Sequence, residues 1–258
     1  MMLRQDIIQW GADHPWQNEN QIEQDLLLSC AMIEIANDPL LSKELVLRGG
    51  TAFHKLFLPQ PYRYSEDLDF IRMGTGGIGD VMKRLTSLGT ELGFTVRTKM
   101  GMYPKVMWRF NFEDDTPGKI KLEINTYERS PMMPLAACDH SVVNPFYEGH
   151  AAIPTFQAEE LVSTKLRALY QRKKGRDLYD LWLALTVLEL DPDKILASFP
   201  AYQPEGVRGE MMIDNLLLKL QTEEFCTDIN AMARIDAPEY DPHDAGKMVI
   251  EQLLCNIE

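Results

Sequence analysis

The chain has 258 residues, 45% of them hydrophobic and 25% charged, so it has the composition of a globular protein and is not a disordered, collagen-like or coiled-coil chain. Its 39 acidic residues outnumber its 26 basic residues and give a net charge of −13, which argues against a broad basic surface for nucleic acid. The acidity is uneven, because residues 189–258 hold 15 acidic and 5 basic residues. The first 188 residues are therefore nearly neutral.

The cysteine pattern and the hydrophobic runs indicate a reduced, cytoplasmic protein with no membrane partner. The four cysteines lie far apart in the chain and form neither a CxxC motif nor a paired Cys/His spacing, so a zinc site or a disulfide framework is not expected. The first residues lack the pattern of a secretion signal, and no segment approaches 18 uninterrupted apolar residues.

Hydrophobic periodicity predicts an α/β pattern followed by helices. A helix is expected from Asn20 to Ala36, with Asn20 and Glu23 forming its capping box. The next elements are expected to be a buried strand at 45–47, a glycine turn at 49–50, a helix through 58, a strand at 67–71, a helix at 80–92, and strands at 94–99, 105–112 and 119–125, the last two forming a hairpin. Helices are then expected at 157–174, 176–188, 191–198, 208–233 and 242–256. We expect an α/β domain with N-terminal helices over residues 1–155 and a helical domain over residues 156–258.

Three carboxylates are expected to share one face of the sheet. Residues two apart in a strand project to the same side, so Asp67 and Asp69 point together while Leu68 faces the core. The same alternation leaves Glu123 on the polar face of its strand, where it joins the aspartates if the two strands are neighbours. Carboxylates this close repel one another unless a cation neutralises them, and such oxygen-rich sites suit Mg²⁺ or Mn²⁺. An isolated DxD is more often solvated charge, but here it follows a glycine turn that opens a helix and offers backbone N–H groups to phosphates.

The order of these motifs resembles a known superfamily. Leu47-Arg48-Gly49-Gly50-Thr51, a gap of 15 residues and Asp67-Leu68-Asp69-Phe70 are similar to the hG(G/S/T)…DxD signature of polymerase-β-like nucleotidyltransferases. Together with Arg63-Tyr64-Ser65-Glu66, Lys121-Leu122-Glu123-Ile124, Lys165 and Arg176-Asp177-Leu178-Tyr179-Asp180-Leu181, they resemble the motifs of the AbiEii/AbiGii toxin family, which includes the MenT-type toxins. The resemblance spans about residues 45–185. It implies an α+β fold, a polymerase-β-like mixed sheet flanked by helices and followed by a C-terminal helical bundle.

The resemblance also implies roles for single residues. Gly49, Gly50, Thr51 and Ser65 belong to the nucleotide site, and Lys165 contacts the triphosphate. Asp67, Asp69 and Glu123 are the expected metal ligands, so the cofactors are Mg²⁺ or Mn²⁺ with an NTP as substrate. The last motif places a catalytic aspartate at Asp177 or Asp180, and we favour Asp180.

A basic stretch opens the helical half. Residues 161–176 contain six basic residues and no acidic one, and Lys165, Arg172 and Arg176 follow helical steps if the helix is not broken at Gly175. This stretch is either a solvated basic face or one side of a cleft that binds a triphosphate and an RNA end. His54, one turn after the glycine turn, is expected on a helix surface.

The leading hypothesis is a metal-dependent enzyme that transfers a nucleoside monophosphate from an NTP to an acceptor hydroxyl. The resemblance implies tRNA as the acceptor class, and a toxin of a toxin–antitoxin or abortive-infection pair with a cognate antitoxin as partner. Two alternatives stay open, namely transfer to a protein or small-molecule hydroxyl, and a non-catalytic NTP-binding regulator. A DxDx(T/V) phosphatase is disfavoured because Tyr64-Ser65-Glu66 precedes the aspartates, and no GxxxxGK(S/T) motif is present.

Overall fold

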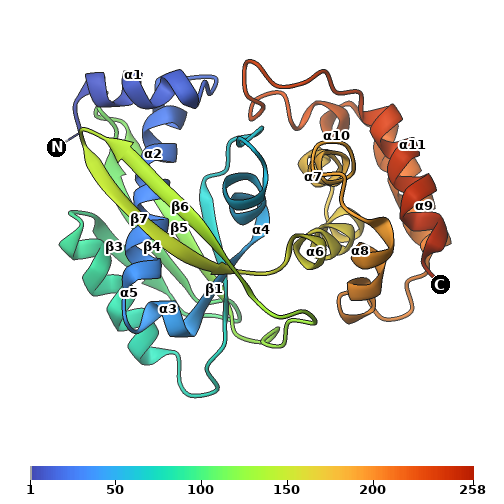
Figure 1. Cartoon of the computed structure of the whole chain (residues 1–258), viewed down its shortest axis with the longest axis horizontal. Coiled ribbons are helices and arrows are strands. Elements are labelled where there is room, and N and C mark those ends of the chain that lie inside the picture. The colour runs from blue at the N-terminus through green and yellow to red at the C-terminus, as the bar shows by residue number, and fades with distance from the viewer. Residues whose placement is uncertain (1) are drawn as a thin grey trace.

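Seven strands form one mixed sheet in the computed structural model, which describes residues 2–258 (Figure 1). The strands are β1 (Leu45–Arg48), β2 (Asp67–Arg72), β3 (Thr95–Lys99), β4 (Lys105–Asn111), β5 (Pro117–Asn125), β6 (Ala136–Asn144) and β7 (Tyr147–Thr155). Their order across the sheet is β3-β4-β5-β2-β1-β7-β6, with β2/β5 and β1/β7 parallel and the other neighbours antiparallel. The predicted strands at 45–47, 67–71, 94–99, 105–112 and 119–125 are thereby confirmed.

N-terminal helices cover the apolar face of this sheet. They are α1 (Arg4–Asp13), α2 (Glu19–Asn37), α3 (Leu41–Glu44) and α5 (Gly79–Glu91). Helix α2 packs on β5, β6 and β7 with Leu28 and Met32 buried, and α5 packs on β3 and β4, where the Trp108 indole donates to the carbonyl of Leu85 at 3.1 Å. The expected cap of α2 was wrong by two residues. Asn18 is the N-cap, and its side chain accepts from the Gln21 N–H at 2.9 Å.

The hairpin of β6 and β7 was not predicted from the sequence. Its inward-facing residues include Val142, Ala151 and Ile153, but most of its other positions are exposed or half-buried. Strand β6 lies at the edge of the sheet and needs little apolar surface, so hydrophobic alternation is weak there. The hairpin nevertheless matters for the site, because β7 pairs with β1 and leads directly into the helical part.

Helices follow residue 155 to the end of the chain and lie together beside the sheet (Figure 1). They are α6 (Ala158–Gln171), α7 (Gly175–Thr186), α8 (Pro192–Ser198), α9 (Gly209–Leu220), α10 (Glu223–Thr227) and α11 (Pro242–Gln252), with short 3₁₀ turns at Phe199–Ala201 and Leu254–Asn256. The single helix expected over 208–233 is wrong, since α9 ends at Leu220 and only the short α10 follows. No helix within residues 2–258 is long and apolar enough to cross a membrane.

A segment near the C-terminus returns to the first half of the chain. Backbone hydrogen bonds join Tyr64 N–H to the Met232 carbonyl at 2.7 Å and Arg234 N–H to the Tyr62 carbonyl at 3.1 Å. The Arg234 guanidinium also donates to the Asp13 carbonyl at 2.9 Å. Residues 231–235, here called the strap, therefore tie the loop before β2 to the helical half.

Candidate active site

The turn between β1 and its helix requires glycine at two successive positions. The chain passes from β1 into α4 (Gly49–Ala52) and then into a π-helical turn, Phe53–Phe57. Gly49 has φ +82°, in the region that favours glycine, and a Cβ there would lie 2.7 Å from Asp69 Oδ2. A Cβ on Gly50 would collide with the Arg63 guanidinium. The turn thus sits directly against the DxD strand on one side and a buried arginine on the other.

The register of the sheet brings the predicted carboxylates side by side. Strands β2 and β5 are parallel neighbours, with Asp69 opposite Glu123 and Asp67 opposite Lys121. Lys121 Nζ lies 2.7 Å from Asp67 Oδ2 and 3.7 Å from Glu123 Oε2. Lys105 Nζ lies 2.7 Å from the same Glu123 oxygen. Two of the three carboxylates are therefore paired with lysines.

The remaining carboxylate, that of Asp69, has no hydrogen bond or ion pair with any residue in 2–258. Burial raises the pKa of Asp69, and the negative charges of Asp67 and Glu123 raise it further, although Arg48 opposes them. The ionised form of Asp69 is therefore less favoured than that of an exposed aspartate, and a cation beside it would favour it.

Asp67 and Asp69 fit a divalent cation better than the full set of three does. Within residues 2–258, no group of three or more His, Cys, Asp or Glu side chains is arranged to hold a metal ion. The two aspartates offer oxygen ligands on one face of β2, and the unpartnered Asp69 leaves the pair short of positive charge. Asp67 would have to exchange its contact with Lys121 to bind a metal, and Glu123 would have to exchange its contacts with both Lys105 and Lys121 to become a third ligand.

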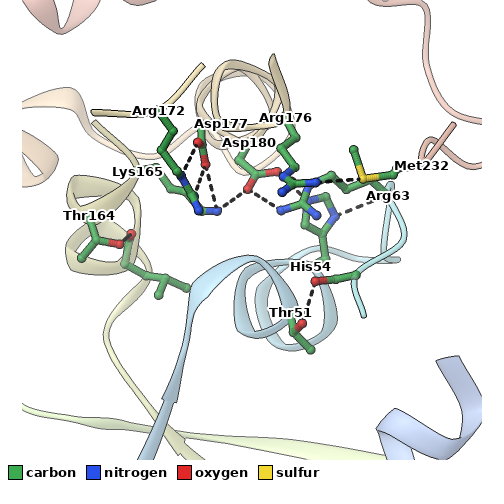
Figure 2. A network of polar contacts seen from close by, with 12 residues as sticks. Thr51, His54, Arg63, Thr164, Lys165, Arg172, Arg176, Asp177, Asp180 and Met232 are labelled. Carbon is green, nitrogen blue, oxygen red and sulfur yellow. Dashed lines mark hydrogen bonds and ion pairs between the residues drawn. The ribbon is translucent and has the colours of Figure 1, made fainter. Parts of the chain in front are cut away.

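Asp180, on α7, is the centre of a buried polar network (Figure 2). Arg63 donates to both of its oxygens, from Nε at 2.7 Å and from Nη2 at 2.8 Å. Lys165 Nζ lies 2.7 Å from Asp180 Oδ2, and His54 Nε2 lies 2.9 Å from Asp180 Oδ1. Burial opposes ionisation of Asp180, but Arg63 and Lys165 hold its pKa well below the usual range.

Asp177 lies one turn earlier on α7 and is also fully buried, with a different main partner. Arg172 donates to both of its oxygens, from Nε at 3.0 Å and from Nη2 at 2.8 Å. Lys165 Nζ lies 3.5 Å from Asp177 Oδ1, farther than from Asp180. Lys165 thus stands between the two aspartates of the last motif, and Asp180 holds it more closely.

The hydroxyl of Thr51 links the glycine turn to the loop before β2. It lies 2.8 Å from the Ser65 hydroxyl and 2.6 Å from the carbonyl oxygen of Asp67. Thr51 is buried whereas Ser65 is half-buried, and Ser65 lines a cavity that Thr51 does not line. Of these two expected nucleotide-site hydroxyls, Ser65 is the one placed to meet a ligand.

Two cavities meet at the site. The first, here called the Glu123 cavity, has a volume of about 460 Å³ and is lined by Arg48, Gly49, Asp69, Phe70, Tyr103, Glu123, Asn125, Glu128, Thr164, Lys165, Arg167, Ala168, Gln171 and Arg172. The second, the Ser65 cavity, has a volume of about 270 Å³ and is lined by Gln21, Gly50, Arg63, Tyr64, Ser65, Glu66, Asp67, Asp69, Lys165, Arg172, Arg176, Ala231 and Met232. Asp69, Lys165 and Arg172 line both. In each cavity four basic side chains face three acidic ones, in contrast to the acidic chain as a whole.

The basic stretch of 161–176 is not a free cationic face. Helix α6 ends at Gln171 and α7 begins at Gly175, so Lys165, Arg172 and Arg176 do not lie on one continuous helix. Acidic partners lie beside the other bases, with Arg167 on Glu128, Lys173 Nζ at 3.7 Å from Glu224 and Lys174 Nζ at 3.5 Å from Asp228. Four of its bases, Lys165, Arg167, Arg172 and Arg176, nevertheless line the two cavities.

Sequence reasoning missed several residues of the site. His54 is buried against Asp180 and not on a helix surface, and burial lowers its pKa to about 4. Arg63 belongs to a motif quoted above, but its bond to Asp180 spans 117 residues and leaves no sequence signal. Glu128 bridges Arg48, at 2.7 Å, and Arg167, and it too follows no motif.

Comparisons with known proteins show the family and the fold of the chain. Residues 31–243 match the family described as nucleotidyl transferase AbiEii toxin, type IV TA system. Among solved structures, the fold is similar to that of MenT4, a nucleotidyltransferase toxin from Mycobacterium tuberculosis H37Rv, with a TM-score of 0.68 and 16% identity over 100% of this chain and 91% of that chain. An antigenic nucleotidyltransferase-like protein from Paracoccidioides brasiliensis matches with a TM-score of 0.43 and 15% identity over 83% of this chain and 95% of that chain. No curated protein matches the chain by sequence. The likeness to MenT4 confirms the predicted α+β fold with a mixed sheet and C-terminal helices.

Proposed function

The chain belongs to the AbiEii family of nucleotidyltransferase toxins of type IV toxin–antitoxin systems, and from this premise we propose that it transfers a nucleoside monophosphate from an NTP to a hydroxyl group of tRNA. The observation that carries the proposal is the Asp69 carboxylate, which lacks a partner and faces both cavities beside Gly49 and Lys165. A site that leaves a half-buried carboxylate unpaired loses folding stability, and a cation with a phosphate ligand would restore it. A cognate antitoxin is the further partner that family membership suggests.

The Ser65 cavity is the better fit for the triphosphate. Gly50, Ser65 and Asp67 line it, together with Arg63, Lys165, Arg172 and Arg176. Backbone N–H groups at a glycine turn and a cluster of cationic side chains are the usual means of holding phosphates. Lys165 is well placed to exchange a carboxylate oxygen of Asp180 for a phosphate oxygen, because it already lines the cavity.

Each remaining residue has a role that its own contacts support. Asp67 and Asp69 would hold Mg²⁺ or Mn²⁺, and the metal when bound would supply electrostatic stabilisation of charge on the phosphates. Glu123 lines the first cavity and not the Ser65 cavity, and there it would accept the proton of an acceptor hydroxyl. Asp180 positions Lys165 and Arg63 without lining either cavity, so we assign the last motif role to Asp180, acting through Lys165.

Incubation of the purified protein with Mg²⁺, each of the four α-labelled NTPs in turn and total tRNA tests the proposal. We expect label on RNA, and we expect Asp69→Ala to abolish it, whereas Asp214→Asn, at an exposed position on α9, keeps it. Label on a protein or on a small cationic molecule, with unlabelled RNA, would show that the acceptor is of that class and is not tRNA. Calorimetric NTP binding without transfer to anything would overturn the enzymatic assignment.

A further inference from the structure

Two exposed tyrosines stand together at the Glu123 cavity. Tyr103, in the loop between β3 and β4, lines the cavity and is 39% exposed, and Tyr127, after β5, is 66% exposed. Their ring centroids are 6.1 Å apart with an interplanar angle of 79°. In such an edge-to-face pair one ring presents its edge, so that its faces stay open. Neither tyrosine is part of the motifs that define the nucleotide site.

Both loops are held in place, so the pair is a built feature of the surface. The Asn125 side chain accepts from the backbone N–H of Tyr127 at 2.8 Å and of Glu128 at 3.0 Å. Glu128 is held in turn by Arg48 and Arg167. On the other loop, the residue after Tyr103 is the buried Pro104, whose carbonyl accepts from the Ile124 N–H at 2.9 Å. The backbone of both loops that carry the tyrosines is therefore held in place by hydrogen bonds.

Resting on the proposed function, we infer that the Tyr103–Tyr127 pair is a stacking platform for the unpaired terminal base of the RNA acceptor, one ring stacking on the base and the other, nearly perpendicular, supporting that ring, and that the Glu123 cavity is the acceptor subsite. The proposed triphosphate residues Gly50 and Ser65 line only the other cavity, whereas the proposed proton acceptor Glu123 lines only this one. Asp69 lines both and lies where donor and acceptor would meet.

The chemistry of the cavity matches a single-stranded RNA end. Such ends are recognised by stacking of unpaired bases on aromatic rings and by hydrogen bonds to their edges. Gln171 supplies an amide group on the same cavity, and its basic side chains exceed its acidic ones by one.

Steady-state kinetics with a short single-stranded RNA, the tRNA pool and each NTP separates the two subsites. Tyr103→Ala and Tyr127→Ala should each raise KM for RNA by about fivefold or more, leaving kcat and KM for the NTP within twofold. Tyr103→Phe should keep the wild-type KM, since stacking needs the ring and not the hydroxyl. Leu218→Ala, at another exposed apolar residue, controls for loss of surface area and should change nothing.

Two results would overturn the inference. A rise in KM for the NTP with an unchanged KM for RNA would place the base of the donor nucleotide in this cavity. Unchanged values of kcat and of both KM constants would show that the tyrosines bind neither substrate. Fluorescence anisotropy of labelled single-stranded RNA without NTP separates this failure from failure of the proposed function. If the wild type transfers nothing yet binds RNA, weaker binding by Tyr103→Ala still supports the platform, whereas equal binding refutes it.

Discussion

Asp69 and Asp180 are carboxylates in opposite situations. Asp180 is fully buried and receives contacts from Arg63, Lys165 and His54. Burial and the neighbouring acidic residues raise the pKa of Asp69 and so disfavour its ionised form. The same substitution of Asp by Asn should therefore have opposite effects on stability at the two positions, because it removes a favourable charge from one and an unfavourable charge from the other.

Asp180→Asn should destabilise the protein strongly. Removing one partner of a buried ion pair leaves Arg63 and Lys165 with uncompensated charge, which costs about 3–5 kcal/mol. For a chain of this size that corresponds to a fall in Tm on the order of 10 °C, measurable by calorimetry. An unchanged Tm would show that water or a rearranged side chain satisfies these cations, and the network in Figure 2 would not be a structural requirement.

Asp69→Asn should remove nucleotide transfer and leave the fold intact. The amide carries no charge to repel Asp67 and Glu123, so in the presence of a chelator we expect the Tm to equal or exceed that of the wild type. Added Mg²⁺ should raise the Tm of the wild type more than that of the variant. A variant with a much lower Tm would contradict this, because it would mean that Asp69 contributes to the fold itself.

At the scale of elements, the glycine turn couples the proposed phosphate site to the buried network around Asp180. Gly50→Ala should lose both activity and stability, because the added methyl collides with an Arg63 guanidinium that Asp180 holds in place at two atoms. Gly77→Ala is the matched control, since a Cβ there meets nothing within 4 Å, and it should behave as wild type. Transfer assays and thermal melts of the two variants, run in parallel, measure both effects. Full activity of Gly50→Ala would show that Arg63 can move away from the turn without consequence.

The elements that sequence reasoning located are those with strong local signals. The alternation of polar and apolar residues in β2 and β5 predicted that Asp69 and Glu123 project from the polar face of the sheet. The register of the two strands confirmed that they are neighbours. Weak alternation hid β6 and β7, and the expected cap at Asn20 was wrong because Asn18, two residues earlier, caps α2. The expected helix over 208–233 was wrong because the periodicity continues across the break after α9.

The contacts that complete the site join segments far apart in the chain and could not be predicted locally. Arg63 meets Asp180 across 117 residues, and His54 meets it across 126. The sequence around an arginine or a histidine does not indicate which distant residue it contacts in the fold. The motifs supplied the candidate residues of the site, while the contacts of Asp180 on α7 with His54 and Arg63 supplied the network that holds them.

At the scale of the molecule, the two halves are joined on both sides of the site. The strap of residues 231–235 binds the Tyr62–Tyr64 loop, and Glu128 connects Arg48 of β1 with Arg167 of α6. The net charge of −13 is compatible with anionic ligands because four of the six bases of 161–176 line the cavities, whereas the last 70 residues carry most of the excess acid. An RNA acceptor would thus meet basic side chains mainly at the cavities.

The contacts of Glu128 with Arg48 and Arg167 should make the free energy of unfolding depend on pH. Burial opposes ionisation of Glu128, but hydrogen bonds and charges from Arg167 and Arg48 hold its pKa at about 2, below the ordinary 4.5. Since the folded pKa is depressed, its stabilisation is complete above pH 4.5 and is lost as the pH falls toward 2. Glu128→Gln should therefore lower the free energy of unfolding by about 1–2 kcal/mol near pH 7, a value reduced for its partial exposure.

The difference between wild type and Glu128→Gln should narrow below pH 4.5 and vanish near pH 2, because protonated Glu128 then resembles glutamine. Denaturant titrations across this range measure it, with Glu251→Gln, an exposed residue of α11, as the control that should show no such trend. A difference that stays constant with pH would assign the effect to packing of the side chain. A difference that follows the depressed pKa would show that the charge of Glu128, held between Arg48 and Arg167, is what joins the sheet to α6 at the edge of the Glu123 cavity.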